Sequence, residues 1–273
     1  MDKFVFFGTP RFAEIFLMGI MEKGFSPSLV VTNPDRPAGR KKELTPPPVK
    51  ILAEKRGIPI LQPDKLSVGF DSKGAEFGIV SAYGGIIPKV AIEAFPKGII
   101  GVHPSLLPLL RGATPIQTAL LEGKTETGVS LFLLDEKVDH GPIINEKQAI
   151  IDENDDYLSL EEKLAEFGAE LFVETIEKYL SGEIAPETQD ESKATFTKKF
   201  SREDAFVHPE TLAAAERGED AFLVSRKIKA FVAEPGAWTI KNGKQMKLLE
   251  CAVLEGKLIL KKIQTEGKNP QTL

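Results

Sequence analysis

Short apolar runs alternate with amphipathic segments over the first half of the chain. The run 4–7 ends at Gly8-Thr9-Pro10, the segment 12–23 has a helical pattern, and a second apolar run covers 29–32. Strand, helix and strand in this order predict two parallel strands joined by a right-handed crossover. The turn at Gly8 lacks the GxGxxG pattern, so it does not indicate dinucleotide binding.

The same alternation continues to about residue 180. Its longest amphipathic segment carries Leu160, Leu164, Phe167, Leu171 and Ile176 near a 3.6-residue spacing. Repeated strand–helix units predict an α/β fold with a Rossmann-like parallel sheet. The further strands are expected at 58–61, 77–81, 99–102 and 127–134, and the helices at 48–57, 114–123 and 159–180.

The pattern changes after residue 180. Residues 181–201 are polar and coil-prone, and we interpret them as a linker between a domain at 1–180 and a smaller one at 202–273. Asn242-Gly243 lies between two short apolar runs and is the strongest hairpin signal in the chain. The second domain is therefore expected to hold one helix, at 221–231, and short antiparallel strands at 237–240, 246–249, 252–254 and 258–260.

Composition is that of an ordinary globular protein. Of 273 residues, 42% are hydrophobic and 27% charged, and the length suffices for two domains. The single cysteine, Cys251, excludes an internal disulfide framework and a cysteine-based zinc site. The sequence contains no apolar span of 18 residues and no recognisable signal peptide. We therefore expect a cytoplasmic protein without membrane contact.

Charge is distributed unevenly. The formal net charge of −5 argues against a generic nucleic-acid binder. Residues 200–273 nevertheless hold 12 Lys+Arg and 10 Asp+Glu, a net +2, which leaves −7 for the rest. A mildly basic tail can contact a phosphate backbone locally, although a solvated surface explains this small excess equally well.

A long basic loop follows the second strand. Residues 33–50 exceed the roughly 2–6 residues usual between a strand and a helix. Basic side chains on such a loop suit phosphate contact, and a solvated charge run is the alternative. The cations concerned are Arg36, Arg40, Lys41, Lys42 and Lys50.

One imidazole and one carboxylate lie where strands are expected to end. His103, one of three histidines, follows the apolar run 98–102, and Asp139 follows the strand 127–134. Enzymes of α/β architecture keep their chemistry on loops after strands, so this pair is a candidate acid–base site. A surface histidine and a turn-capping aspartate remain the structural alternatives.

The segment His103–Gly112, here called the signature loop, reads His-Pro-Ser-Leu-Leu-Pro-Leu-Leu-Arg-Gly. It resembles the formyltetrahydrofolate-dependent formyltransferases. Similar motifs follow in the same order over nearly the whole chain. They lie at 6–10, 35–42, 44–50, 82–84, 139–141, 193–195 and 235–239.

The resemblance implies an enzyme that moves a formyl group from 10-formyltetrahydrofolate, as co-substrate, to the amino group of methionyl-initiator tRNA in translation initiation. It implies an OB-like β-barrel for 202–273 that contacts tRNA. The chain ends somewhat earlier than family members usually do, which leaves open whether a closing element is absent. A monomer is expected, and the reaction requires neither a metal nor a covalent nucleophile.

Site residues can be carried over by position. His103 and Asp139 match the family's catalytic His and Asp, which serve a tetrahedral intermediate that needs a proton acceptor and oxyanion donors. The basic loop matches the part that engages tRNA, through Arg36, Arg40, Lys41 and Lys42. Folate contacts are expected from Tyr83, Gly84, Ile86, Ser105, Leu106, Leu107 and Pro108.

One position departs from the family pattern. Gly101 stands where the family has an Asn two residues before the catalytic His. Loss of one oxyanion donor costs on the order of 10²–10³ in rate. Water could donate instead, His140 or Ser105 could reach in, or the protein is a catalytically impaired folate- or tRNA-binding homologue. A second rival is a formyltransferase that acts on a small amine such as an amino-sugar nucleotide.

Overall fold

The computed structural model describes residues 3–38, 42–66 and 70–273. Tertiary contacts divide the chain into two compact units, and the chain passes between them several times. The predicted domain limits at 180 and 201 stay a prediction. The first unit comprises Met1–Arg111, Gly128–Ala149 and Glu162–Thr195, and the second comprises Gly112–Thr127, Ile150–Glu161 and Phe196–Leu273.

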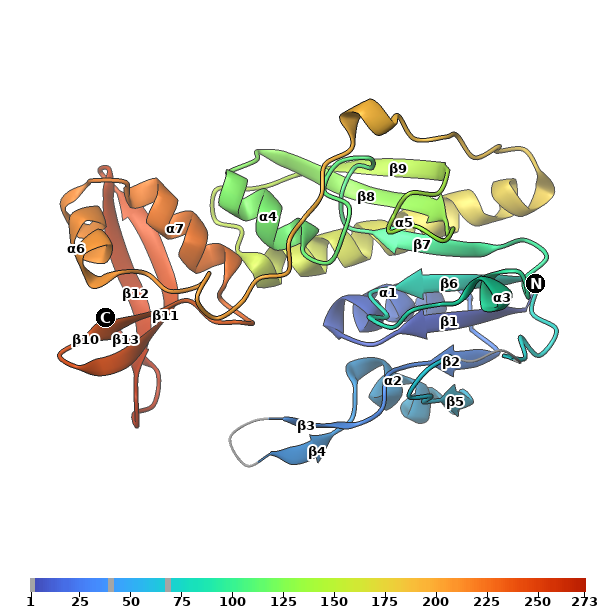
Figure 1. Cartoon of the computed structure of the whole chain (residues 1–273), viewed down its shortest axis with the longest axis horizontal. Coiled ribbons are helices and arrows are strands. Elements are labelled where there is room, and N and C mark those ends of the chain that lie inside the picture. Colours follow the sequence, from blue (N-terminus) through green and yellow to red (C-terminus); the bar gives the residue numbers. More distant parts are fainter. Residues whose placement is uncertain (1–2, 39–41, 67–69) are drawn as a thin grey trace. The chain divides into compact units, whose positions relative to one another are not determined.

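A seven-stranded sheet forms the centre of the first unit, in the order β5-β2-β1-β6-β7-β8-β9 (Figure 1). The strands from β5 to β7 are mutually parallel, as the alternating pattern predicts, whereas β8 pairs antiparallel with β7. The sheet is therefore mixed. Its strands are β1 (Phe4–Gly8), β2 (Leu29–Val31), β5 (Ile60–Leu61), β6 (Phe77–Ser81), β7 (Ile99–His103), β8 (Glu126–Leu133) and β9 (Ile143–Ile150).

The two faces of this sheet have different covers. On one face, Phe16 of α1 and Gly168 of α5 pack beside Val102 and Val129. On the other, Phe7 and Ile99 belong to a buried cluster that includes Tyr83 and Phe95. Helices thus cover one face, while loops and α3 cover the face that holds the candidate site. The helices are α1 (Arg11–Glu22), α2 (Pro48–Arg56), α3 (Lys89–Ile92) and α5 (Tyr157–Ser181).

Part of the long basic loop is a hairpin. β3 (Arg36–Ala38) pairs antiparallel with β4 (Glu43–Thr45), and the pair stands apart from the seven-stranded sheet (Figure 1). The tip falls outside the described residues, and two of the predicted tRNA contacts, Arg40 and Lys41, lie there.

The second unit contains the predicted small β domain, as a four-stranded antiparallel sheet in the order β10-β11-β12-β13. The predicted hairpin turn is confirmed, because Asn242 and Gly243 both have positive φ, 52° and 72°. The two strands expected at 246–249 and 252–254 are one strand with an irregularity at Glu250. The elements are α4 (Pro115–Glu122), α6 (Pro209–Arg217), α7 (Ala221–Ala230), β10 (Trp238–Lys241), β11 (Lys244–Leu254), β12 (Lys257–Thr265) and β13 (Gln271–Thr272).

Membrane-spanning helices and metal clusters are both absent from the described residues. No helix among them combines the length and the apolar composition that crossing a bilayer needs. Within the same residues, no group of three or more His, Cys, Asp or Glu side chains is arranged to hold a metal ion.

Candidate active site

His103 is the last residue of β7, and its side chain is 8% exposed. Its Nε2 lies 2.9 Å from the carbonyl oxygen of Leu110, and its Nδ1 lies 3.5 Å from Oδ2 of Asp139. A carbonyl only accepts hydrogen bonds, so Nε2 carries the donated hydrogen. In the neutral ring Nδ1 is then unprotonated and faces the carboxylate. Nδ1 is therefore the ring nitrogen that can accept a proton, and it lies next to Asp139.

Asp139 reaches His103 by an indirect route. Since β8 runs antiparallel to β7, the end of β8 lies beside the start of β7, with Leu134 N donating to Ile99 O. The chain then folds back so that the Asp139 carboxylate, 20% exposed, approaches the imidazole. Asp139 adopts a positive φ of 48°. The structure thus brings the two predicted catalytic residues together, although not by adjacent strand ends.

Gly101 lies two residues before His103 and is covered by an aromatic ring. It pairs directly with Phe132 of β8, whose side chain is buried. A Cβ added at Gly101 would lie 2.2 Å from Cε1 and 2.4 Å from Cζ of that ring. The side chain of the family's Asn therefore has no room while Phe132 keeps this position.

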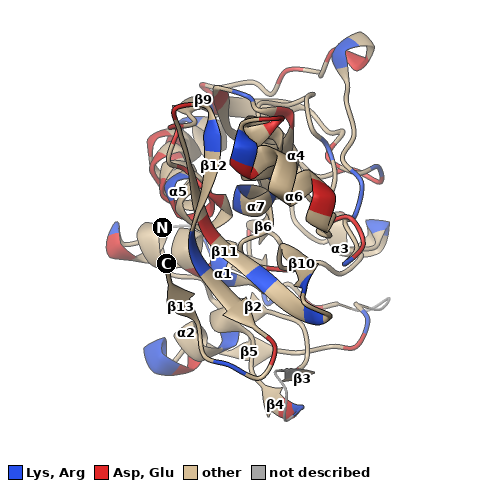
Figure 2. Cartoon of the chain, turned by 90° about the vertical axis from the view of Figure 1, so that its left-hand side faces the viewer, with Lys and Arg blue, Asp and Glu red and all other residues tan. Residues whose placement is uncertain are grey.

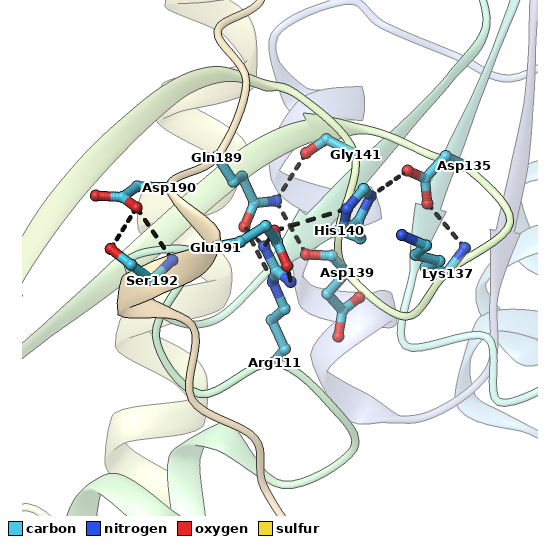
Figure 3. Close-up of polar contacts among 10 residues, drawn as sticks. All are labelled: Arg111, Asp135, Lys137, Asp139, His140, Gly141, Gln189, Asp190, Glu191 and Ser192. Carbon is cyan, nitrogen blue, oxygen red and sulfur yellow. Dashed lines mark hydrogen bonds and ion pairs between the residues drawn. The ribbon is translucent and has the colours of Figure 1, made fainter.

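The two side chains named as substitute oxyanion donors are directed elsewhere. Ser105 Oγ donates to the carbonyl of Leu109 at 2.6 Å. His140 Nδ1 lies 2.5 Å from Asp135 Oδ2, and its Nε2 lies 3.6 Å from Glu191 Oε1 (Figure 3). Both histidine nitrogens thus face carboxylates.

Ser130 of β8 hydrogen-bonds the backbone of the signature loop. Its hydroxyl oxygen accepts from Leu107 N at 2.9 Å and lies 2.7 Å from the carbonyl oxygen of Ser105 and 2.5 Å from Glu146 Oε1, the two acceptors for its single hydrogen. The Ser105 and Leu107 side chains are buried, and the Leu107–Pro108 peptide bond is cis. Ser105 and Leu107 were predicted to contact folate, but their side chains are packed inside the loop. Contact with a ligand is therefore left to their backbone groups.

The second predicted folate segment follows β6. Tyr83 is 4% exposed, its ring packs edge-on against Phe7, and burial raises its pKa. Its carbonyl accepts hydrogen bonds of 2.9 Å from Thr9 Oγ1 and Asn33 Nδ2. Ile86, by contrast, is 89% exposed. The segment is therefore anchored at the buried Tyr83, and it presents the apolar side chain of Ile86 on the surface.

The basic hairpin has a fixed base and exposed strands. Lys50 Nζ lies 2.7 Å from Asp35 Oδ2, and hydrogen bonds from Gln62 and Lys50 lower the pKa of Asp35. Lys50 is thus committed to an ion pair at the base. Arg36 and Lys42, in the described part of the hairpin, are exposed.

A polar cluster around the buried side chains of Arg111 and Gln189, with the exposed Glu191 at its edge, was not predicted from the sequence (Figure 3). Arg111 is 1% exposed, and its guanidinium donates to Gln189 Oε1 and to both carboxylate oxygens of Glu191. Hydrogen bonds from Arg111 lower the pKa of the Glu191 carboxyl. Gln189 and Glu191 lie in a polar coil without periodicity, so no local signal marks them. Arg111 itself stands in the signature loop, and that place was the one signal that could have drawn attention to it.

Comparison with known proteins agrees with this geometry. Residues 2–176 match the model of a family described as formyl transferase. The chain is 41% identical to methionyl-tRNA formyltransferase of Bacillus velezensis over 253 residues, which cover 91% of this chain and 77% of the relative.

Two solved structures share the fold. Methionyl-tRNA formyltransferase from Clostridium thermocellum has a TM-score of 0.63 at 16% identity, covering 97% of this chain and 99% of its own. An N-formyltransferase from Helicobacter canadensis, solved with folinic acid and dTDP-3-aminofucose, has a TM-score of 0.67 at 18% identity, covering 93% and 88%.

Proposed function

The chain belongs to the formyl transferase family, and we propose that it transfers a formyl group from 10-formyltetrahydrofolate to the amino group of methionyl-initiator tRNA. The identity to methionyl-tRNA formyltransferases supports this acceptor, since it extends over 91% of the chain and so covers most of the second unit as well as the first. The observation that carries the chemistry is the pairing of Asp139 with His103, the first residue of the signature loop.

The proposed reaction uses this pair for proton transfer. The acceptor amine attacks the formyl carbon, and the new C–N bond forms as the amine proton passes to the Asp139–His103 pair. The proton then goes to N10 of the folate as the carbon–N10 bond breaks, so the products are formylated amine and tetrahydrofolate. Asp139 is the more accessible member, and His103 Nδ1 beside it can hold the proton meanwhile.

We assign the folate to the surface next to the hydrophobic cluster that includes Tyr83 and Phe95, in the first unit. Support comes from Gly84, which is exposed and has no side chain to cover its backbone, and from the exposed side chain of Ile86. Leu106, which is partly buried, and Pro108 are proposed to border the ligand from the signature loop. No metal enters this proposal.

We assign tRNA contact to the basic hairpin and to the sheet of the second unit. Arg36 and Lys42 supply exposed charge on the hairpin, and Arg40 and Lys41 would add to it. Lys and Arg also recur along β11 and β12 (Figure 2). A role in translation initiation further implies a protein that works in the cytoplasm, and we expect it to act as a monomer.

A formylation assay tests the proposal. Wild-type protein is given 10-formyltetrahydrofolate with either charged initiator tRNA or a dTDP-linked amino sugar, the second acceptor being suggested by the fold shared with the Helicobacter canadensis enzyme. We expect formyl-methionyl-tRNA and no formylated sugar. His103→Ala and Asp139→Asn should each abolish most of the activity while the protein stays folded. Preference for the sugar, or near-wild-type rates in both variants, contradicts the proposal.

A further inference from the structure

We propose that Gln189 is a positioning residue for formyl transfer, which holds the loop 135–141 so that the Asp139 carboxylate stays beside His103. This inference rests on the proposed function. Gln189 does not contact the reacting groups itself. It acts through the backbone of the residue that does.

The contact is a double hydrogen bond to the loop backbone. Gln189 Nε2 donates to the carbonyl of Asp139 at 3.0 Å and to that of Gly141 at 2.7 Å (Figure 3). Asp139 has a positive φ of 48°, a left-handed conformation that is uncommon outside glycine, although Asp adopts it more readily than most residues. Gln189 therefore bridges the two residues whose backbone determines where the carboxylate points.

Arg111 determines which way the Gln189 amide faces. Its guanidinium has only donors, and Nε and Nη2 donate to Gln189 Oε1 at 3.1 and 2.7 Å. A flipped amide would place its NH₂ group against the guanidinium and its oxygen against two carbonyls. Both side chains are buried, so water cannot replace the lost partners cheaply. The donors of Gln189 are thus permanently directed at the Asp139 loop.

The same segment holds the other partner of His103. Thr195 Oγ1 accepts from Leu110 N at 2.8 Å, and Thr195 O accepts from Arg111 N at 2.9 Å. Leu110 also has a positive φ, 57°, and its carbonyl accepts from His103 Nε2. Both ring nitrogens of His103 therefore face groups whose backbones are supported from the segment 189–195.

Two backbone hydrogen bonds anchor this segment to the sheet. Ile143 N donates to Glu187 O at 2.8 Å, and Glu187 N donates to Ile143 O at 2.7 Å. Glu187 lies two residues before Gln189, so the support is tied to the start of β9. The polar coil that follows α5 is accordingly a structural part of the site.

Gln189→Glu is the most direct test. The carboxylate keeps the length of the side chain and its contact with Arg111, but it has no hydrogen to donate and faces two carbonyl oxygens. We expect kcat to fall about 10- to 100-fold, since a displacement of about 1 Å at a reacting group can cost that much. The dissociation constant of folate, measured by titration, should change less than about threefold, because this contact is remote from the ligand.

Two further readouts separate positioning from general loss of structure. Hydrogen exchange in Gln189→Glu should rise in peptides covering 135–141 and stay unchanged in those covering β1 and β6. In an Asp139→Asn background, Gln189→Glu should lower the residual kcat by less than about threefold, because coupled residues are not additive. Gln189→Met, which lacks donors and adds no charge, is the second variant if the carboxylate prevents folding.

Ser192→Ala is the matched control. It perturbs the 3₁₀ turn Glu191–Lys193, which begins two residues after Gln189, by removing the hydrogen bond of Ser192 Oγ to Asp190, and it leaves the Gln189 side chain unchanged. Its kcat should equal that of the wild type. The inference is overturned if folded Gln189 variants keep wild-type turnover, or if they lose as much in the Asp139→Asn background as in the wild type. A wild-type protein that formylates neither acceptor would instead overturn the proposed function.

Discussion

Substituting Gly101 by Asn tests how the chain manages without the family's amide. The new Cβ would lie 2.2 Å from Cε1 of Phe132, whereas carbon atoms in contact are about 3.5–4.0 Å apart. The ring must therefore move by more than about 1 Å in a sheet where Phe132 is only 2% exposed. Overpacking of this kind costs about 1–3 kcal/mol.

The potential catalytic gain is of similar size. One oxyanion donor is worth about 2.7–4 kcal/mol in the transition state, or 10²–10³ in kcat. We expect Gly101→Asn alone to lower Tm and leave kcat no higher, because the strained side chain cannot take the donor's position. Gly101→Asn with Phe132→Val removes the colliding ring. This double variant should raise kcat by about 10²-fold while the folate dissociation constant changes little, since the new interaction strengthens only in the transition state.

The assay combines thermal unfolding, folate titration and initial rates of formyl-methionyl-tRNA synthesis, with Phe132→Val alone as the control for the cavity. A single Gly101→Asn variant that is as stable as the wild type would show that the ring yields freely and that the steric argument is wrong. A folded double variant with wild-type kcat would show that the pocket already has another donor.

Three further predictions address other parts of the molecule. Ser130→Ala should destabilise the fold by about 1–3 kcal/mol in urea titrations, because it removes the hydroxyl that hydrogen-bonds Leu107 N, the carbonyl of Ser105 and the half-buried Glu146 carboxylate; an unchanged midpoint contradicts this. The double variant Arg36→Ala, Lys42→Ala should weaken tRNA binding and leave folate affinity unchanged. The slope of log K against log salt should become shallower by the equivalent of up to about two phosphate contacts, and an unchanged slope would refute the assignment. Asp204, whose pKa is lowered to about 2 by hydrogen bonds from Lys198 and Ser201, contributes stability that is present above pH 3.8 and lost as pH falls toward 2. The stability difference between wild type and Asp204→Asn should therefore shrink over that window, and a constant difference would contradict the pKa shift.

Much of the fold could be predicted from the sequence, because turns and helix ends depend on the conformational preferences of a few neighbouring residues. Asn242-Gly243 supplies two consecutive positive φ values, and a hairpin turn of this type requires both. Gly57 and Gly123 end α2 and α4 in the left-handed conformation, as expected of glycine after a helix. The buried run of β7 ends at His103, so the apolar pattern alone marks this histidine as a candidate base at a strand end.

Tertiary structure decided what surrounds that base. The strand direction of β8 is invisible in its apolar pattern, because a buried strand has the same pattern in either direction. That direction brings Phe132 over Gly101, and it obliges the following loop to return toward His103.

The sequence by itself therefore determined the family, the α/β order and the identity of His103 and Asp139 as candidates, because these depend on local patterns and short motifs. It could not determine that Gln189 and Arg111, 78 positions apart, form a buried pair that supports Asp139. Contacts at such separations arise only when the chain closes on itself, and a polar coil leaves no periodic trace of the partner that it will meet.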